Sequence, residues 1–293
     1  MEAQLSEIPK YPDFSEITIE LRPILHPLFK QLDSSISEFS FANIYLFRKT
    51  HNYRVTQLED GLIVIAGKDK KPFFMVPFGI PEEEMLKELF QKFSSMKAAT
   101  AEQAHNLSLE YIVEEDRDNF DYLYSRDELS KLSGRKYHKK KNLVNFFTGT
   151  YTYVGKPLLD EYIKDALFVL EQWRAGQADE GDYEAAKEAL ERSNELQLCG
   201  GIYYVEDGPA AFALGEELEP HTFVLHFEKG IGDYKGLLQF VNQSFASILP
   251  EKYQIINREQ DLGDEGLRKS KLSYKPSGFV KKYRIYPKSS SEK

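Results

Sequence analysis

Apolar and polar residues alternate along several short segments in the first half of the chain, and this pattern predicts β-strands. Residues 16–21 (EITIEL) alternate in this way, and three apolar segments follow between residues 55 and 79. The dipeptide Asp60-Gly61 separates two of these segments and is a favoured hairpin turn sequence. We therefore expect an antiparallel group of strands in this region.

Two segments of the first half are predicted to be helical. Residues 81–96 begin with a proline and acidic residues, and their apolar residues then recur every three or four positions. Residues 37–49 are rich in aromatic side chains and are predicted to form a buried helix. Residues 98–125 give a weak strand–helix–strand pattern.

The second half shows the same order of elements. They are a strand at 150–154, helices at 158–176 and 182–196, a hairpin at 200–218, a strand at 221–230, a helix at 233–249, a strand at 253–262, a helix at 264–274 and a strand at 279–287. The order of elements repeats, although the residues themselves do not.

A duplicated α+β unit is the simplest explanation of this repeated order. A chain of 293 residues has room for two domains of roughly 130 to 150 residues each. We predict a first domain over residues 1–130, a basic connecting helix over 131–149 and a second domain over 150–293. Each domain is expected to hold a mixed, mostly antiparallel central sheet flanked by helices.

The composition narrows the class of protein. A formal net charge of -9 argues against general coating of nucleic acid, although a local basic patch can still hold an anion. Cys199 is the sole cysteine, which fits a reducing cytoplasm. No segment approaches the roughly 18 apolar residues of a membrane helix, and no secretory signal pattern is visible. We expect a cytoplasmic and monomeric protein.

The same sequence offers no pattern for a metal site. The histidines follow no metal-ligand spacing, and a single cysteine cannot complete a zinc set, so we predict no metal. The Gly-x-Ser-x-Gly motif of serine hydrolases and the P-loop of nucleotide-binding proteins are also missing from the sequence.

Positive charge is concentrated in one place, because five of the seven residues from 135 to 141 are lysine or arginine. If this segment is helical, four polar residues lie on one face. These are Arg135, His138, Asn142 and Asn145. The apolar residues that follow would anchor the end of the helix in a core.

The basic segment has two possible roles. In the first, Arg135 and Lys140 neutralise an anionic donor or acceptor, with Asn142 and Asn145 beside them, and His138 accepts a proton from an attacking amine. In the second, the segment is a solvated, charged linker that pairs with an acidic helix. The sequence leaves both open.

A second polar cluster follows the predicted strand at 253–262. Asn257, Arg258, Glu259 and Asp261 stand near the end of this strand, where ligands bind in splayed sheets. Arg258 is expected to hold a carboxylate or phosphate, and Glu259 or Asp261 to act as a general base. The alternative is a salt-bridged corner between a strand and a helix.

Two further charged residues, Glu228 and Lys229, end the predicted strand at 221–230. They are expected either to line a ligand-binding cleft or to pair with neighbours across the sheet. The sequence does not separate these possibilities.

Five segments carry a resemblance to a known family. They are residues 37–48, 73–79, 134–147, 226–230 and 256–276. Through them the chain resembles the soluble C-terminal domain of phosphatidylglycerol lysyltransferases and its stand-alone bacterial relatives. This family consists of tandem domains of the GCN5-related N-acetyltransferase (GNAT-like) fold, and it is similar to the Fem peptidyltransferases, which use aminoacyl-tRNA.

The resemblance implies where a donor would bind. In this fold the donor enters between two parallel strands that part, here residues 221–227 and 253–259. The usual acetyl-CoA signature is matched by Gly230 but carries Phe227 where a glutamine or arginine is typical. The resemblance also implies that Tyr274 protonates the leaving thiolate; the alternative is that Tyr274 only packs on the edge of the sheet.

Two hypotheses about function follow. The first is an enzyme that transfers an acyl or aminoacyl group from acyl-CoA or aminoacyl-tRNA to an amine or hydroxyl, with no tightly bound cofactor and with a single site in the second domain. The second is a non-catalytic, duplicated module that binds an anionic ligand or a protein. Phe227 favours the second hypothesis, whereas the cluster at 257–261 favours the first.

Overall fold

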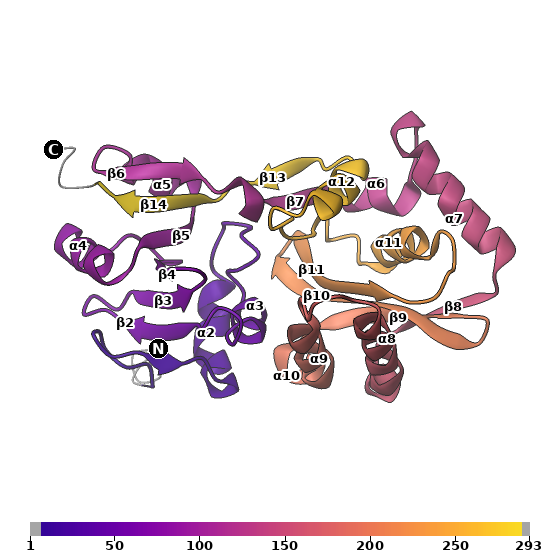
Figure 1. Ribbon diagram of the computed structural model, residues 1–293, viewed down its shortest axis with the longest axis horizontal. Helices are drawn as coiled ribbons and strands as arrows, with labels where there is room; N and C mark the ends of the chain where they lie inside the picture. Colours follow the sequence, from indigo (N-terminus) through magenta and orange to yellow (C-terminus); the bar gives the residue numbers. More distant parts are fainter. Residues whose placement is uncertain (1–6, 289–293) are drawn as a thin grey trace. The chain divides into compact units, whose positions relative to one another are not determined.

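The computed structural model describes residues 7–288, and the chain divides into two compact units (Figure 1). Unit 1 comprises residues 1–121 with 280–293, and unit 2 comprises residues 122–279. This division differs from the predicted one, which placed the junction at 131–149 and gave the last strand to the second domain. The C-terminal strand instead pairs with strands of unit 1, and the basic segment belongs to unit 2.

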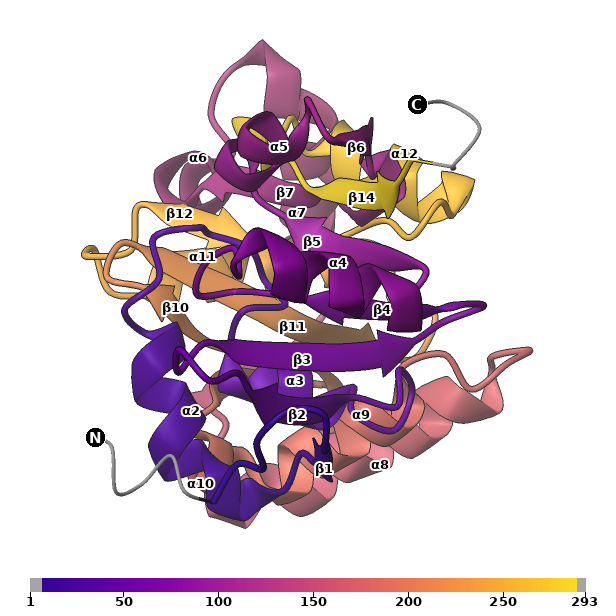
Figure 2. The same cartoon turned by 90° about the vertical axis from the view of Figure 1, so that its left-hand side faces the viewer.

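Unit 1 is built on a mixed sheet with seven strands in the described part of the chain. Their order is β1-β2-β3-β4-β5-β14-β6, and Figure 2 faces this unit. Strands β4 and β5 run parallel, whereas the other neighbours are antiparallel. The strands are β1 Ser15–Glu16, β2 Arg54–Gln57, β3 Ile63–Lys68, β4 Pro72–Met75, β5 Ser95–Ala99, β6 Tyr111–Glu115 and β14 Tyr283–Pro287.

The helices of unit 1 include the amphipathic helix that the sequence predicts. Its apolar face, formed by Leu86, Leu89 and Phe90, packs in a core with Phe74 of β4 and Met96 of β5. Burial of each such side chain stabilises the fold by about 1.5–3 kcal/mol. The α-helices are α2 Arg22–Phe29, α3 Phe41–Leu46, α4 Glu83–Lys92 and α5 Ala101–Leu107.

Two predicted elements of unit 1 are shorter than expected. The strand predicted at 16–21 is confined to β1, and Ile19–Leu21 forms a 3-10 turn that leads into α2. Pro23 explains this, because proline presets helical φ and stands within the first turn of α2. The helix predicted at 37–49 is the six-residue α3, whose first turn is capped by the Ser40 side chain.

Unit 2 holds a second mixed sheet, again with seven strands among the described residues. Their order is β13-β7-β12-β11-β10-β9-β8. Strand β11 runs parallel to β12 and antiparallel to β10. The strands are β7 Asp121–Ser125, β8 Tyr153–Pro157, β9 Cys199–Val205, β10 Gly208–Glu219, β11 Thr222–Gly230, β12 Ile255–Asn257 and β13 Gly278–Val280.

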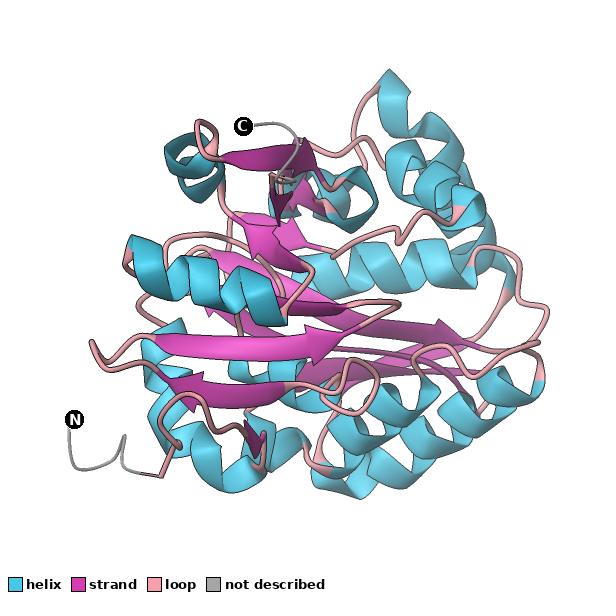
Figure 3. Ribbon diagram, turned by 60° about the vertical axis from the view of Figure 1, so that its left-hand side comes forward, coloured by secondary structure: helices cyan, strands magenta, loops and turns pink. Residues whose placement is uncertain are grey.

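Helices cover both faces of this second sheet (Figure 3). Helix α8 packs on β10 and β11 from one side, and α11 packs on the other side beside α6 and α7 (Figure 1). The α-helices are α6 Arg126–Lys131, α7 His138–Thr150, α8 Ile163–Ala175, α9 Tyr183–Glu191, α10 Ser193–Leu196, α11 Leu237–Ile248 and α12 Glu265–Ser273. The α+β class expected from the sequence is therefore confirmed.

The basic segment does not form the continuous helix that the sequence analysis assumed. Helix α6 ends with Leu132 in a left-handed conformation, and Gly134 also has a positive φ of 84°. A 3-10 turn at Arg135–Tyr137 then leads into α7. Because the helix is interrupted, Arg135 does not lie on one helical stripe with Asn142 and Asn145.

Candidate functional site

Strands β11 and β12 separate after a short parallel pairing. Their pairing ends at Val224 and Asn257, whereas β11 continues to Gly230. The expectation that residues 221–227 and 253–259 form neighbouring parallel strands that part is thus confirmed. Beyond the last pair, the backbone groups of β11 and of the segment after β12 are no longer joined by the ladder of this parallel pairing.

A β-bulge in β11 lies at the same place. Leu214 of β10 pairs with Phe227, and the next residue, Gly215, pairs with Leu225. His226 is therefore the extra residue of the bulge. Bulges re-aim side chains and bend strands, so this one accompanies the separation of β11 from β12.

The chain turns sharply after β12 and is held by several hydrogen bonds. The side-chain oxygen of Asn257 accepts a hydrogen bond from the Glu259 amide at 2.8 Å, and the Arg258 amide donates to the Tyr122 carbonyl at 2.9 Å. The ammonium of Lys271 donates to the carbonyls of Arg258 and Glu259. Glu259 has a φ of 56°, which a non-glycine residue adopts only when its surroundings hold it there.

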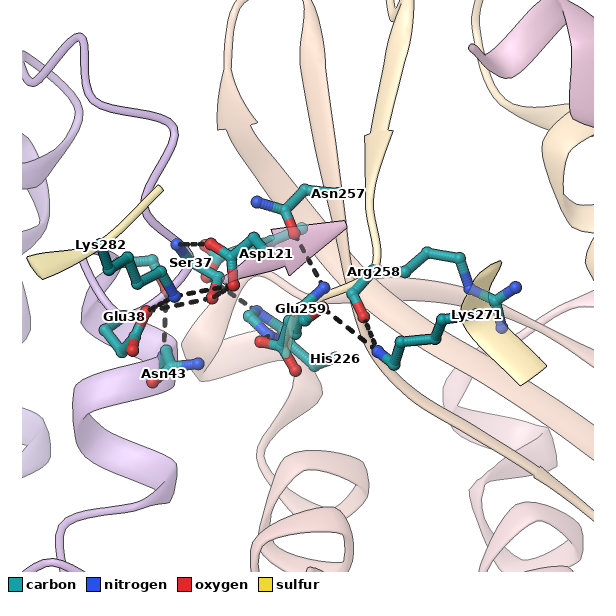
Figure 4. Close-up of polar contacts among 12 residues, drawn as sticks. Ser37, Glu38, Asn43, Asp121, His226, Asn257, Arg258, Glu259, Lys271 and Lys282 are labelled. Carbon is teal, nitrogen blue, oxygen red and sulfur yellow. Dashed lines mark hydrogen bonds and ion pairs between the residues drawn. The ribbon is translucent and has the colours of Figure 1, made fainter. Parts of the chain in front are cut away.

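The Arg258 side chain leaves this turn on the side away from Glu259 (Figure 4). Its guanidinium is 3.2 Å from a carboxylate oxygen of Glu228, and the carboxamide of Asn242 lies within hydrogen-bond distance of both. The rings of Tyr124 and Tyr274 lie 5.9 and 5.4 Å from the guanidinium carbon. Arg258 is therefore fixed by a carboxylate and two aromatic rings.

Tyr274 and Lys140 complete this group, which we call the Arg258 cluster: Arg258, Glu228, Asn242, Tyr274 and Lys140. The Lys140 ammonium lies 3.9 Å from the centre of the Tyr274 ring. Burial, with a contribution from Glu228, raises the pKa of Tyr274 to about 12, so its hydroxyl stays protonated at neutral pH. Burial and the charge of Arg258 lower the pKa of Lys140.

His226 is held on the other side of the turn. Its Nδ1 is 2.8 Å from Glu259 (Figure 4), and its Nε2 is 3.2 Å from Glu216, so a carboxylate oxygen faces each ring nitrogen. Burial alone would lower the pKa of His226, but Glu259 and Glu216 outweigh it and raise the pKa to about 10. This engages Glu259 with His226 on the side of the turn away from the Arg258 side chain, which argues against its predicted role as the general base for a ligand held by Arg258.

Asp261 is likewise engaged by neighbouring donors. It accepts hydrogen bonds from Tyr122 at 2.6 Å, from Arg268 at 2.7 and 2.9 Å, and from the Gly263 amide at 3.0 Å. Burial alone would raise the pKa of Asp261, but these donors hold it well below its usual range. Its geometry is that of a structural anchor between the turn and α12, which is the salt-bridged corner left open by the sequence.

Lys229 and Gly230 take no part in the Arg258 cluster. The Lys229 ammonium is 2.7 Å from Asp182 and lies 3.9 Å from the centre of the Trp173 ring, so it faces α8 and α9. At Gly230, a Cβ would come within 2.9 Å of Leu238, so the missing side chain lets α11 approach β11. Lys229 therefore pairs with a residue at the start of α9, and not with a neighbour across the sheet as one of its two predicted arrangements had it.

The basic segment contributes one residue to the cluster. Lys140 is half-buried against Tyr274, as described above. The side chains of Arg135, His138, Asn142 and Asn145 are exposed, and no described contact joins them to Arg258. Their predicted roles as ligand-binding or proton-accepting residues gain no support from this placement.

Three residues that shape this region were not predicted from the sequence. They are Asn242, Glu216 and His226. Asn242 could have been found, because it is a polar residue within the largely apolar helix α11. His226 and Glu216 gave no signal, because their partners are distant in sequence or lie beyond a bulge.

Unit 1 has a buried charged cluster of its own (Figure 4). The Lys282 ammonium is paired with Glu38 and, at 2.7 Å, with Asp121, and all three side chains are buried. The Ser37 hydroxyl and amide donate to Asp121 at 2.9 and 2.8 Å. Its donors and acceptors satisfy one another, so we assign this cluster a structural role.

Some classes of site are not found in the part of the chain that the structure describes. Within residues 7–288, no helix is both long and apolar enough to cross a bilayer. Over the same residues, no three side chains among His, Cys, Asp and Glu are grouped as metal ligands.

Comparison with known proteins identifies related chains. Residues 29–286 match the family model described as phosphatidylglycerol lysyltransferase, C-terminal. A conserved protein of unknown function from Bacteroides thetaiotaomicron is 30% identical, with a TM-score of 0.84 over 94% of this chain and 99% of that one.

Two further solved structures are similar in fold. L-PGS from Bacillus licheniformis is 17% identical, with a TM-score of 0.55 over 82% of this chain and 86% of that one. FemX is 9% identical, with a TM-score of 0.56 over 94% of this chain and 97% of that one. These similarities agree with the tandem acetyltransferase-like fold expected from the sequence.

Proposed function

Because the chain belongs to the phosphatidylglycerol lysyltransferase C-terminal family, we propose that it transfers an aminoacyl group from aminoacyl-tRNA to an amine or hydroxyl acceptor. One observation carries the proposal. Strands β11 and β12 part after Val224 and Asn257, and the Arg258 cluster lies directly beyond that point. Parting parallel strands expose backbone donors, and the cluster adds two cations and a phenol beside them.

The chemistry begins with attack of the acceptor on the ester carbonyl. Arg258 and Lys140 would stabilise the negative charge that develops on the carbonyl oxygen or on a donor phosphate. Glu228 is 3.2 Å from Arg258 and would accept the proton that the acceptor loses. A new bond forms between the acceptor and the carbonyl carbon, and the ester bond to the ribose oxygen breaks.

Tyr274 would supply the proton that the leaving oxygen needs. A phenol whose pKa is about 12 is matched to a strongly basic alkoxide, such as a ribose oxygen. A thiolate, whose conjugate acid has a pKa of about 8.5, leaves without such help. A proton donor at this place is therefore needed more by an oxygen ester than by a thioester, which supports aminoacyl-tRNA over acyl-CoA as the donor in this proposal.

The alternative is a module that binds an anion without transferring a group. Phe227 supports this alternative, because its buried ring occupies the position where the acetyl-CoA signature has a polar side chain. The two proposals share the same anion-binding residues. They differ in whether the Tyr274 hydroxyl is needed as a proton donor.

The experiment separates them. The purified chain is incubated with labelled lysyl-tRNA, alanyl-tRNA or acetyl-CoA and with either phosphatidylglycerol vesicles or small amines, and the transferred label is counted. We expect transfer from an aminoacyl-tRNA, with a loss of roughly 10²–10⁴-fold in Tyr274→Phe. Tyr253→Phe is the matched control, because its hydroxyl bonds to Glu217 away from the cluster.

A second pair of variants tests the anion site. Arg258→Ala should weaken lysyl-tRNA binding by about 10–100-fold, since a charged hydrogen bond contributes about 1.5–3 kcal/mol. Arg135→Ala should weaken it less, because Arg135 is exposed and no described contact joins it to the Arg258 cluster. The non-catalytic alternative would be established if lysyl-tRNA binds without any transfer of label and if Tyr274→Phe binds it as tightly as the wild type does.

A further inference from the structure

We propose that His226 is a positioning residue whose imidazolium, held between Glu216 and Glu259, fixes the turn that aims Arg258 at the site. This proposal rests on the proposed function in one respect, namely that Arg258 binds the donor or the acceptor. We call these three residues the His226 clasp. The geometry itself is independent of any activity.

The charge of His226 follows from hydrogen-bond chemistry. Each ring nitrogen faces a carboxylate oxygen, at 2.8 Å for Nδ1 and 3.2 Å for Nε2. An ionised carboxylate only accepts hydrogen bonds, and a neutral imidazole has only one N–H to donate. Both contacts are satisfied when the ring carries both protons, and the raised pKa of His226 agrees with this state.

The clasp acts on a backbone that needs to be held. Glu259 has a φ of 56°, a conformation that costs a non-glycine residue of order 1 kcal/mol or more. The amide of Glu259 is bonded to Asn257, and its carbonyl accepts from Lys271 and from the Tyr122 amide. The Glu259 carboxylate is held by the His226 ring, whose Nδ1 is 2.8 Å away.

Arg258 is the neighbour that this arrangement orients. Its side chain leaves the turn on the opposite side from Glu259 (Figure 4), and its guanidinium is 3.2 Å from Glu228. A change in the backbone dihedrals of Glu259 would move the Arg258 guanidinium away from Glu228 and Tyr274. His226 therefore acts on the site through Arg258, without touching the ligand.

The bulge explains why a histidine in a strand can reach this turn. His226 is the unpaired residue of β11, so its side chain is free of the regular alternation of the strand. The groups facing it are Glu216 from β10 and Glu259 from the turn, and Cys199 of β9 lies near Glu216. Lys271 approaches the same turn through backbone carbonyls.

Nuclear magnetic resonance tests the proposal on the full chain. The protonation of both His226 ring nitrogens and the Nε–H signal of Arg258 are followed between about pH 6 and pH 11 in the wild type, Glu259→Gln and Glu217→Gln. Glu217→Gln is the matched control, because this neighbour of Glu216 pairs with Lys252. This experiment requires neither an aminoacyl donor nor an acceptor substrate.

We expect both ring nitrogens to be protonated near pH 7, and the Arg258 signal to shift at the same pH at which His226 loses its proton. Glu259→Gln should lower the His226 midpoint by about one unit or more, a tenfold loss of proton affinity, and should move the Arg258 signal. Glu217→Gln should do neither.

A neutral His226 ring near pH 7, or an Arg258 signal that ignores the titration of His226, would overturn the proposal. If Glu259→Gln does not fold, the wild-type titration alone decides. Failure of aminoacyl transfer would leave these signals unchanged, so the two proposals fail separately.

Discussion

The imidazole of His226 is buried between Glu216 and Glu259, and it therefore contributes to stability through its charge. Its pKa is raised from 6.5 to about 10 by these carboxylates, which outweigh burial. The folded state binds this proton more tightly than the unfolded state does. The resulting stabilisation is complete below about pH 6.5 and is lost as the pH rises toward about 10.

We therefore expect the free energy of unfolding of unit 2 to fall between about pH 6.5 and pH 10. Trp173 is the single tryptophan of the chain, so its fluorescence during urea unfolding reports this unit. His226→Gln should flatten the pH dependence in that window, whereas His221→Gln, an exposed control, should keep it. A wild-type profile that is flat from pH 6.5 to 10 would contradict the assignment.

Single residues could be predicted where their own neighbourhood in the sequence revealed them. Arg258 and Tyr274 stand at the predicted end of a strand and of a helix, and the structure brings both together with Glu228 and Lys140. The engagement of Glu259 by His226 could not be predicted, because a side chain 33 positions away in the sequence forms the contact. Residues such as Arg258 and Tyr274 could therefore be predicted from the sequence, whereas the contact between Glu259 and His226 could not.

At the scale of elements, the bulge in β11 is the decisive irregularity. Gly215 of β10 stands at its register shift, and a Cβ there would overlap the carbonyl of Val224 and touch the ring of Phe223. Periodicity predicts strands at 200–218 and 221–230 but does not reveal a bulge, because the apolar pattern of a buried strand lacks alternation. The bulge had to be seen in the structure.

Gly215→Ala is expected to destabilise unit 2 by about 1–3 kcal/mol, the range for overpacking a tight site. The methyl group would displace β11 near His226, so the variant should also lower the pKa of His226. Gly208→Ala is the control, since its Cβ would meet only a carbonyl 3.7 Å away. Equal unfolding midpoints for the two variants, followed by Trp173 fluorescence, would refute this account of the bulge.

At the scale of the whole molecule, the chain returns to its first unit at the C-terminus. Strand β14 pairs with β5 and β6, and Lys282 just before it is buried against Glu38 and Asp121. The repeated order of elements predicted two domains, but it could not reveal that the last strand belongs to the first. Strand pairing is a non-local contact. An apolar pattern predicts a strand, but it does not show with which other strand that strand pairs.

Lys282→Met should destabilise unit 1 by about 3–5 kcal/mol, because it leaves two buried carboxylates without their cation. Circular dichroism should then show an early unfolding transition that Trp173 fluorescence, which reports unit 2, does not follow. Lys281→Met is the control, since Lys281 pairs with Glu115 at the surface. Unfolding curves that match for Lys282→Met and Lys281→Met would rule out this role.

We propose that aminoacyl transfer takes place where β11 and β12 part, beside the Arg258 cluster. The most direct measurement is a crystal structure of the chain with 3'-lysylamino-3'-deoxyadenosine, a stable mimic of the end of lysyl-tRNA. We predict that its amide carbonyl lies within hydrogen-bond distance of Tyr274 or Arg258, beyond Val224 and Asn257. Density for the mimic elsewhere on the chain would contradict this proposal. So would binding of the mimic that is equally tight in the wild type and in Arg258→Ala.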